Sequence, residues 1–204
     1  YEATFDTNYI RWARDLQATQ DRLFWDQDEG GYFSTSGEDA SILLRMKEMY
    51  DGAEPSPNSI AALNLQRLAS FSDTATYAEK PLLIFRQLGR QLTSSPSATP
   101  QMLIAIDAHL HKTKQIVIAG DPSKKDTQAM LKAIREAYLP HKVILLADGA
   151  DHQAYLAQEL AFLKDVRPTD GKATAYVCEN FVCQLPTTEV AVMMKQLGIS
   201  TSTP

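Results

Sequence analysis

Two carboxylates and one amide lie just before the clearest helical pattern of the chain: Asp51, Glu54 and Asn58. Two prolines between them stiffen this entry and keep the preceding residues extended, and either Asn58 or Ser59 can cap the helix. Because the helix macrodipole favours anionic groups at its N-terminus, we expect the three side chains to gather there. Two carboxylates in different environments can act as general acid and general base. The loop predicts either a site for a polyhydroxylated ligand or a well-capped connection with exposed acids.

A second group lies in the acidic turn that follows the first helical pattern. It combines Asp26, Asp28 and Glu29 with the aromatic side chains of Trp25 and Tyr32. The two rings can stack on a sugar face while Asp26 accepts a hydroxyl. The alternative is a solvated acidic turn with Trp25 in the core. The turn lacks the spacing of an EF-hand calcium loop, so we expect no metal here.

Cys178 and Cys183 form a third group, separated by four residues. That spacing differs from the redox Cys-x-x-Cys motif, and a zinc site would need two further ligands. A disulfide requires the two Cα atoms to approach within about 7 Å. A redox pair and two buried structural thiols are the two interpretations, and free cysteines are commonly buried. The sequence favours two buried structural thiols.

Two turns follow apolar runs, at residues 120–122 and 147–149. Neither has the spacing of a dinucleotide-binding loop or a P-loop, and no Gly-x-Ser-x-Gly nucleophile motif is present. His109 and His111 flank a predicted helix end, where a cation suits the dipole. The sequence therefore predicts ordinary turns and no cofactor.

The composition excludes several classes of protein. A net charge of −5 over 204 residues argues against a binder of nucleic acid. No apolar run approaches the length needed to span a bilayer, so we expect no membrane segment. Two cysteines do not make a disulfide framework, which favours a cytoplasmic protein. Because the chain begins at Tyr1 rather than at methionine, we expect a cut or processed piece of a longer protein.

The pattern of apolar residues divides the chain into two parts. Helical spacing predicts helices over residues 5–25, 58–71, 74–93 and 100–111. Apolar, largely β-branched runs then predict strands at 115–119, 142–146 and 173–178, which alternate with helices at 126–138, 152–164 and 187–197. This alternation predicts a small, mostly parallel α/β layer. We assign residues 1–99 to helical hairpins and residues 100–204 to an α/β portion with a C-terminal helix.

Four stretches, in the same order along the chain, resemble the spermatogenesis-associated protein 20-like family. They are residues 24–33, 50–59 (YDGAEPSPNS), 115–120 (QIVIAG) and 176–183 (YVCENFVC). Proteins of this family join an N-terminal thioredoxin-like domain to a helical toroid of the six-hairpin glycosidase type. The resemblance implies that this chain is a C-terminal part, mainly α, with partial (α/α) toroid helices followed by the α/β layer. Pro57 stands where the family usually has glycine.

The resemblance also implies a function. A carboxylate-lined cleft would bind or act on carbohydrate in the manner of a glycosidase or sugar epimerase. Asp51 and Glu54 would be its acid and base, and its ligand contacts would be Asn58, Asp26, Tyr32 and Trp25. The alternative is a non-catalytic scaffold for the thioredoxin-like redox domain of the same parent chain.

Overall fold

The computed structural model describes residues 1–179 and 182–199, and the chain divides into two compact units. The helical unit is Asn8–His111, and the α/β unit combines Tyr1–Thr7 with the chain from Lys112 onward. The expected combination of a helical part and an α/β part is confirmed. Residues 100–111 lie in the helical unit, whereas the sequence-based division placed them in the α/β portion.

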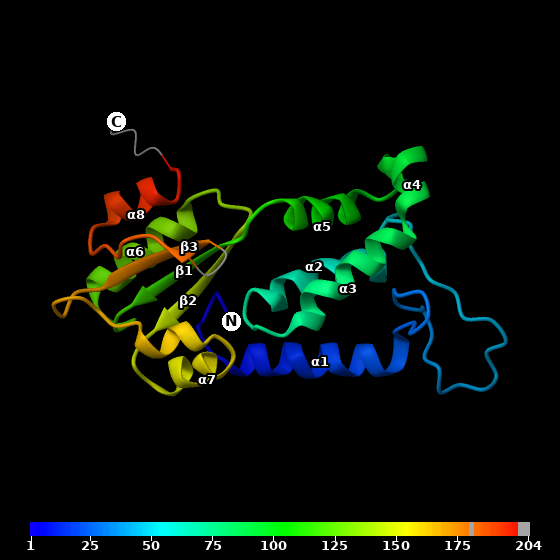
Figure 1. The fold of residues 1–204 in the computed structure, drawn as a ribbon, viewed down its shortest axis with the longest axis horizontal. Helices are drawn as coiled ribbons and strands as arrows, with labels where there is room; N and C mark the ends of the chain where they lie inside the picture. The colour runs from blue at the N-terminus through cyan, green and yellow to red at the C-terminus, as the bar shows by residue number, and fades with distance from the viewer. Residues whose placement is uncertain (180–181, 200–204) are drawn as a thin grey trace. The chain divides into compact units, whose positions relative to one another are not determined.

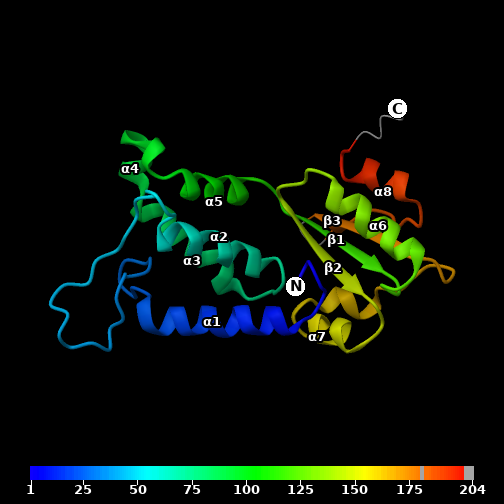
Figure 2. The same ribbon diagram turned by 180° about the vertical axis from the view of Figure 1, so that it is seen from behind.

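The helical unit is built around α2, which packs against α3 and α5 (Figures 1 and 2). Its helices are α1 (Asn8–Phe24), α2 (Pro57–Ala69), α3 (Ala75–Gln87), α4 (Gly89–Ser94) and α5 (Pro100–Leu110), with a short 3-10 turn at Pro96–Ala98. Residues from α2, α3 and α5 are fully buried in its core, among them Leu65, Ile84 and Met102. The predicted helix over 74–93 is divided, because α3 ends at Gln87 and α4 begins at Gly89.

The residue that caps α2 differs from the two that the sequence suggested. The cap is Ser56, whose hydroxyl accepts a hydrogen bond from the Ser59 amide at 3.2 Å. Pro57 then occupies the first helical position, where its missing amide proton costs nothing. The expectation that Asn58 or Ser59 caps this helix is therefore wrong, and both side chains are buried inside its first turn.

The α/β unit contains a four-stranded sheet in the order β2-β1-β3-β4. The strands are β1 (Lys114–Ala119), β2 (Lys142–Ala147), β3 (Thr174–Glu179) and β4 (Val182–Cys183). Strands β1 and β2 are parallel, whereas β3 is antiparallel to both β1 and β4. The prediction of a mostly parallel layer is wrong. A turn in which Asp170 and Gly171 have positive φ precedes β3.

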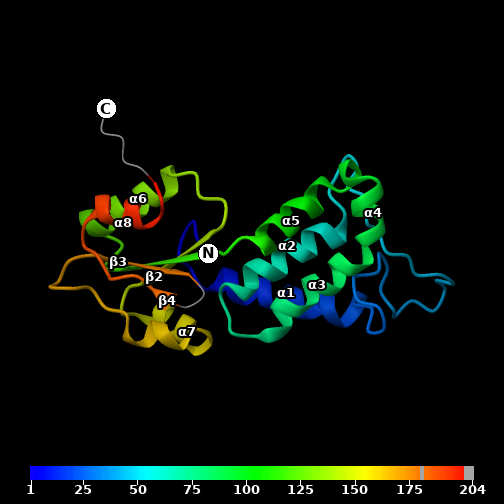
Figure 3. The ribbon, with the colours of Figure 1, turned by 45° about the horizontal axis from the view of Figure 1, so that its top comes forward.

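Helices cover both faces of this sheet. Figure 3 shows α6 (Lys125–Glu136) and α8 (Val190–Gln196) on one face and α7 (Asp151–Glu159) on the other. A second 3-10 turn, Ala161–Asp165, follows α7 and packs against it. The core beneath α6 and α8 includes Ile116, Ile144 and Val177 from three adjacent strands. Because successive strand residues point to opposite faces of the sheet, each helical layer covers the side chains of one face.

The first residues of the chain cover the outer edge of β2. The Tyr1 hydroxyl accepts a hydrogen bond from the Leu146 amide at 3.1 Å, and Glu2 Oε1 accepts one from the Ile144 amide at 2.9 Å. Phe5 is buried in the same core as α6 and α8. An uncovered edge strand presents unpaired amides to other chains, and these two side chains occupy them. None of the helices in the described part of the chain combines the length and apolar character needed to cross a bilayer.

Candidate functional site

Asp51 connects the beginnings of two helices. Its side chain is buried, with the residue 7% exposed. Oδ1 accepts a hydrogen bond from the amide of Ser56, the cap of α2, at 2.8 Å. Oδ2 accepts one from the amide of Met102, in the first turn of α5, at 3.0 Å. Amides in the first turn of a helix have no partner within the helix, so one carboxylate satisfies donors from two helices.

These contacts also determine the charge of Asp51. Burial opposes ionisation, but hydrogen bonds from Ser56, Ser59 and the Met102 amide outweigh it and hold the pKa of Asp51 below its ordinary value. A carboxylate with a lowered pKa stays ionised at neutral pH and makes a poor general acid. The arrangement is suited to holding α2 and α5 together, and a catalytic role for Asp51 stays a prediction.

Glu54 lies in the same loop but is exposed. Its carbonyl oxygen accepts a hydrogen bond from the Gly52 amide at 3.1 Å. The ring of Tyr50, itself 59% exposed, lies so close to Gly52 that a Cβ there would meet Tyr50 Cε1 at 2.8 Å. This loop therefore presents an aromatic ring and a carboxylate to solvent.

Asn58 is completely buried and uses both ends of its amide. Oδ1 accepts a hydrogen bond from the Tyr32 amide at 2.7 Å, and Nδ2 donates to the Tyr32 carbonyl at 2.9 Å. Nδ2 also donates to the Glu48 carbonyl at 3.0 Å. Asn58 thus joins α2 to two loops of the helical unit, and these contacts explain its burial.

The side chains of Tyr32 and Trp25 belong to a network centred on Asp21. The Tyr32 hydroxyl donates to Asp21 Oδ1 at 2.6 Å, and Lys80 Nζ lies 2.7 Å from Asp21 Oδ2. Lys80 also lies 4.6 Å from the ring centroid of Trp25, which makes an edge-to-face contact with Tyr32. Burial and the neighbouring Asp21 raise the pKa of the Tyr32 phenol. Sequence reasoning missed Asp21; its spacing four residues after Gln17, which also donates to it, was the available signal.

Asp26 is paired with a lysine from a distant loop. Lys47 Nζ lies 2.6 Å from Asp26 Oδ2, and the two side chains are only 13% and 12% exposed. The other carboxylate oxygen accepts hydrogen bonds from the amides of Asp28 and Glu29. Burial opposes the charge, but Lys47 and these amides together lower the pKa of Asp26. Asp28 and Glu29 themselves are exposed, as the interpretation of a solvated turn expected.

The two cysteines are joined by a disulfide, so the preferred interpretation as two free thiols is wrong. Cys178 and Cys183 face each other across the antiparallel β3–β4 pair, with Cα atoms 3.9 Å apart. Cys178 is completely buried, whereas Cys183 is exposed. β4 has only two residues, and so short a strand leaves no periodic signal from which the pairing could be predicted.

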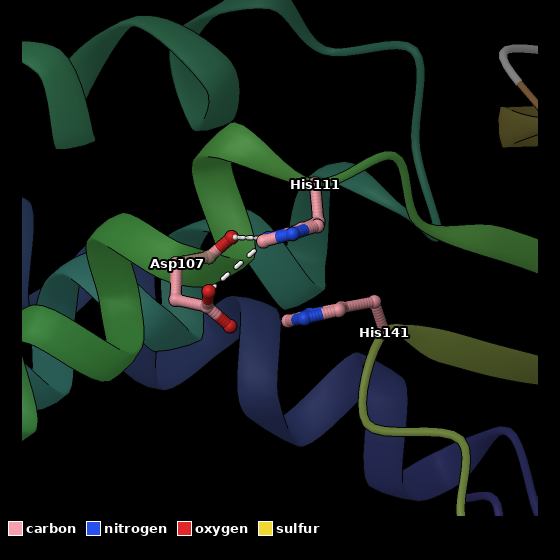
Figure 4. A group of neighbouring side chains, drawn as sticks. All are labelled: Asp107, His111 and His141. Atoms are coloured by element: carbon pink, nitrogen blue, oxygen red, sulfur yellow. Dashed lines mark hydrogen bonds and ion pairs between the residues drawn. The ribbon is translucent and has the colours of Figure 1, made fainter.

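His111 ends α5, as expected for a histidine near a helix C-terminus. Its Nδ1 lies 2.8 Å from the carbonyl oxygen of Asp107 and 3.1 Å from Asp107 Oδ1. Figure 4 shows these two contacts at the last turn of the helix. Both side chains are largely exposed.

The chain is therefore a mixed α/β protein of two units. One is helical and holds buried polar side chains, and the other contains a small mixed sheet whose last two strands are joined by a disulfide. The chain is 41% identical over 198 residues to spermatogenesis-associated protein 20 of Homo sapiens and to that of Mus musculus. These alignments cover 97% of this chain but only 25% of each relative. An uncharacterized Caenorhabditis elegans protein, B0495.5, is 29% identical over 187 residues. No protein-family model matches the chain.

Proposed function

We propose that this chain is a non-catalytic scaffold that serves a thioredoxin-like redox domain within a longer parent protein. The observation that carries the proposal is the full engagement of Asp51. Both oxygens of this carboxylate accept backbone hydrogen bonds from helix beginnings, so it lacks the freedom that a proton-transferring group needs. The side-chain amide of Asn58 is likewise fully used, because it hydrogen-bonds to backbone groups of Tyr32 and Glu48. These residues hold a rigid structure in place.

The connectivity of the α/β unit supports the same proposal. The order β1-α6-β2-α7-β3-β4-α8, with the sheet order β2-β1-β3-β4 and α7 opposite α6 and α8, is typical of thioredoxin-like domains. The redox dithiol of such domains is a Cys-x-x-Cys motif close to a βαβ pattern. Here the loop between β1 and α6 reads Gly-Asp-Pro-Ser-Lys and contains no cysteine. A module of this kind suits a supporting role beside an active redox domain.

The relatives also leave room for such a partner, because the chain spans about a quarter of their length. The loop that leads to Asp51 exposes several large apolar side chains, including Leu43, Leu44 and Met46. Exposed apolar groups that lie close together are typical of surfaces that bind another protein segment. We assign this loop to the contact with the rest of the parent protein.

The test is association between this chain and the remainder of the human relative, produced as a separate polypeptide and studied by calorimetry. We expect saturable binding that the Leu43→Ser/Leu44→Ser variant weakens. The matched control is Tyr138→Ser, which removes an exposed aromatic group in the α/β unit and should leave binding unchanged. Absence of binding in both reducing and oxidising buffer would contradict the scaffold.

A second candidate, carbohydrate binding, is favoured by the exposed ring of Tyr50 and the exposed side chain of Glu54, which lie in the same loop. An aromatic face for stacking and a carboxylate for hydroxyl groups are the groups that a sugar site requires. The test is calorimetric titration with a panel of mono- and disaccharides. Saturable heat that is lost in both Tyr50→Ala and Glu54→Gln, and retained in Tyr138→Ala, would favour this candidate. If no sugar gives a heat of binding, the scaffold remains the one proposed function.

A further inference from the structure

We propose that the Cys178–Cys183 bond is a reversible redox site that a dithiol reductant opens, releasing residues 182–184 from the edge of the sheet. The bond links a central strand to an edge strand. Cys178 lies in β3, which pairs with β1 on its other side, whereas Cys183 lies in β4, at the end of the sheet. The proposal is independent of the scaffold function, because small-molecule thiols suffice to test it.

The two cysteine residues differ in exposure. Cys178 is completely buried and Cys183 is exposed. A thiolate must approach one sulfur of a disulfide in order to break it, and access therefore directs the attack to Cys183. The geometry distinguishes this bond from a structural disulfide buried at both ends.

The disulfide adds to a small set of contacts around β4: its pairing with β3, and the hydrogen bonds that Gln184 and Leu185 make with Gln196 of α8. Val182 and Leu185, on either side of Cys183 and Gln184, are 75% and 85% exposed, so this segment buries little apolar surface. Its backbone is held by pairing with β3, including the bond from the Gln184 amide to the Val177 carbonyl at 2.9 Å. Further along, Thr187 and Ala175 exchange two backbone hydrogen bonds. Opening the disulfide should free residues 182–184, while Thr187 stays anchored.

The exchange reaction balances with a dithiol as the co-reactant. Its thiolate attacks Sγ of Cys183, the sulfur–sulfur bond breaks, and the electron pair goes to Sγ of Cys178, which takes up a proton. The second thiol of the reductant then attacks the mixed disulfide and releases Cys183 as a thiol. The reductant leaves as its own disulfide, having supplied two electrons and two protons.

Because β3–β4 pairing holds Cys178 beside Cys183, an attached second thiol on the reductant favours opening of the bond. After the first attack, the Cys178 sulfur lies beside the mixed disulfide and can displace the reductant again. A monothiol such as glutathione has no attached second thiol to compete with this return, whereas dithiothreitol has one. The structure therefore predicts selectivity for dithiols over monothiols at equal total thiol concentration.

The experiment treats the folded chain with dithiothreitol or glutathione, removes the reductant by acid quench, and counts free thiols with a maleimide in denaturant so that buried Cys178 is also labelled. A parallel sample follows amide exchange by NMR. With dithiothreitol we expect about two labelled thiols per chain and at least about tenfold faster exchange of the Gln184 amide. The Thr187 amide, the internal control, should be unaffected. Cys183→Ser, which cannot form the bond, should show the fast Gln184 exchange without any reductant.

Three outcomes would overturn the proposal. The bond could resist dithiothreitol until the chain unfolds, which would make it purely structural. Glutathione could open it as well as dithiothreitol does, which would remove the selectivity. The Gln184 amide could exchange at the same rate in the oxidised chain, the reduced chain and Cys183→Ser, which would show that the bond does not hold β4.

Discussion

The side chain of Asn58 pairs with the backbone of Tyr32 in both directions. Oδ1 accepts from the Tyr32 amide at 2.7 Å while Nδ2 donates to the Tyr32 carbonyl at 2.9 Å. The amide group thus takes the place of a neighbouring strand for one residue. It fixes the segment after the acidic turn to the first turn of α2, 26 residues further along the chain.

Asn58→Asp tests this pairing with little change of shape. The variant replaces a donor by an acceptor, so the carbonyls of Tyr32 and Glu48 lose their partner and a charge is introduced into a buried site. We expect a loss of roughly 3 kcal/mol in the free energy of unfolding, measured by urea denaturation. Asn64→Asp, on the exposed side of the same helix, is the control and should change stability by less than about 0.5 kcal/mol. Equal losses would contradict the assigned role.

Asp51→Asn tests the carboxylate that joins α2 and α5. One oxygen becomes an amino group facing a backbone donor, and the negative charge near two helix beginnings is lost. We expect a destabilisation of about 1–3 kcal/mol at neutral pH, measured by thermal and urea unfolding. Glu54→Gln, in the same loop but exposed, should be nearly neutral. If Asp51→Asn is as stable as the parent protein, the carboxylate does not hold α2 and α5 together.

The pH dependence of stability should carry the signature of Asp51. Its pKa is lowered in the folded protein, so its contribution is complete above the unfolded value of about 3.9 and is lost as the pH falls through the folded value. The deficit of Asp51→Asn relative to the parent should therefore shrink on acidification below about pH 4. Unfolding free energies of both proteins across this range provide the measurement, and a deficit that grows on acidification would reverse the assignment.

The ion pair between Asp26 and Lys47 should contribute more than an exposed pair does. Both side chains are largely buried, so removal of one costs the other its shortest charged contact. Lys47 then keeps Glu29 Oε2 at 3.7 Å, and Asp26 keeps two backbone amides. A double-mutant cycle with Asp26→Asn and Lys47→Met should give a coupling of roughly 1–3 kcal/mol. The control cycle is Arg22 with Glu38, whose side chains are 63% and 67% exposed, and its coupling should stay below about 1 kcal/mol. Similar couplings in the two cycles would refute the prediction.

Gly30→Ala should disturb the contact between the acidic turn and α3. Gly30 has φ +82°, and a Cβ there would lie 2.7 Å from Leu83 Cβ. Gly149 has a similar φ of +77° but faces open space, so Gly149→Ala isolates the backbone cost of about 1–2 kcal/mol. We expect Gly30→Ala to lose at least about 1 kcal/mol more than this control. Thermal unfolding of the two variants measures the difference, and equal losses would rule out the steric contact.

Much of the fold was predictable because local patterns determine it. The β-branched run over 115–119 and the apolar run over 142–146 became β1 and β2, since buried strands carry such runs. The direction of β3 was not predictable in this way, because periodicity carries no information on which strand is its neighbour. The expected boundary near residue 99 differs from the observed one for a similar reason: Met102 and Ala105 pack into the core of the helical unit.

The sequence placed Asp51, Glu54 and Asn58 in one stretch before a helix, but the contacts that occupy Asp51 and Asn58 include partners far along the chain. Proline and cap residues correctly indicated a helix beginning near residue 57. Nothing in that stretch showed that Met102, 51 residues away, would donate to Asp51. Lys47 and Asp26 likewise come from separate loops. Local sequence does not distinguish a carboxylate that binds a ligand from one that binds backbone amides of its own chain.

The seven residues at the start of the chain make the α/β unit discontinuous in sequence, with the helical unit inserted into it. A shortened chain beginning at Lys112 would lose the groups that Tyr1 and Glu2 supply to Ile144 and Leu146. Its β2 would become an open template for strand addition by a second molecule. A protease cut within the helical unit has a different effect, because both segments of the α/β unit survive it. The two pieces would then remain associated without a covalent link and separate only on denaturation.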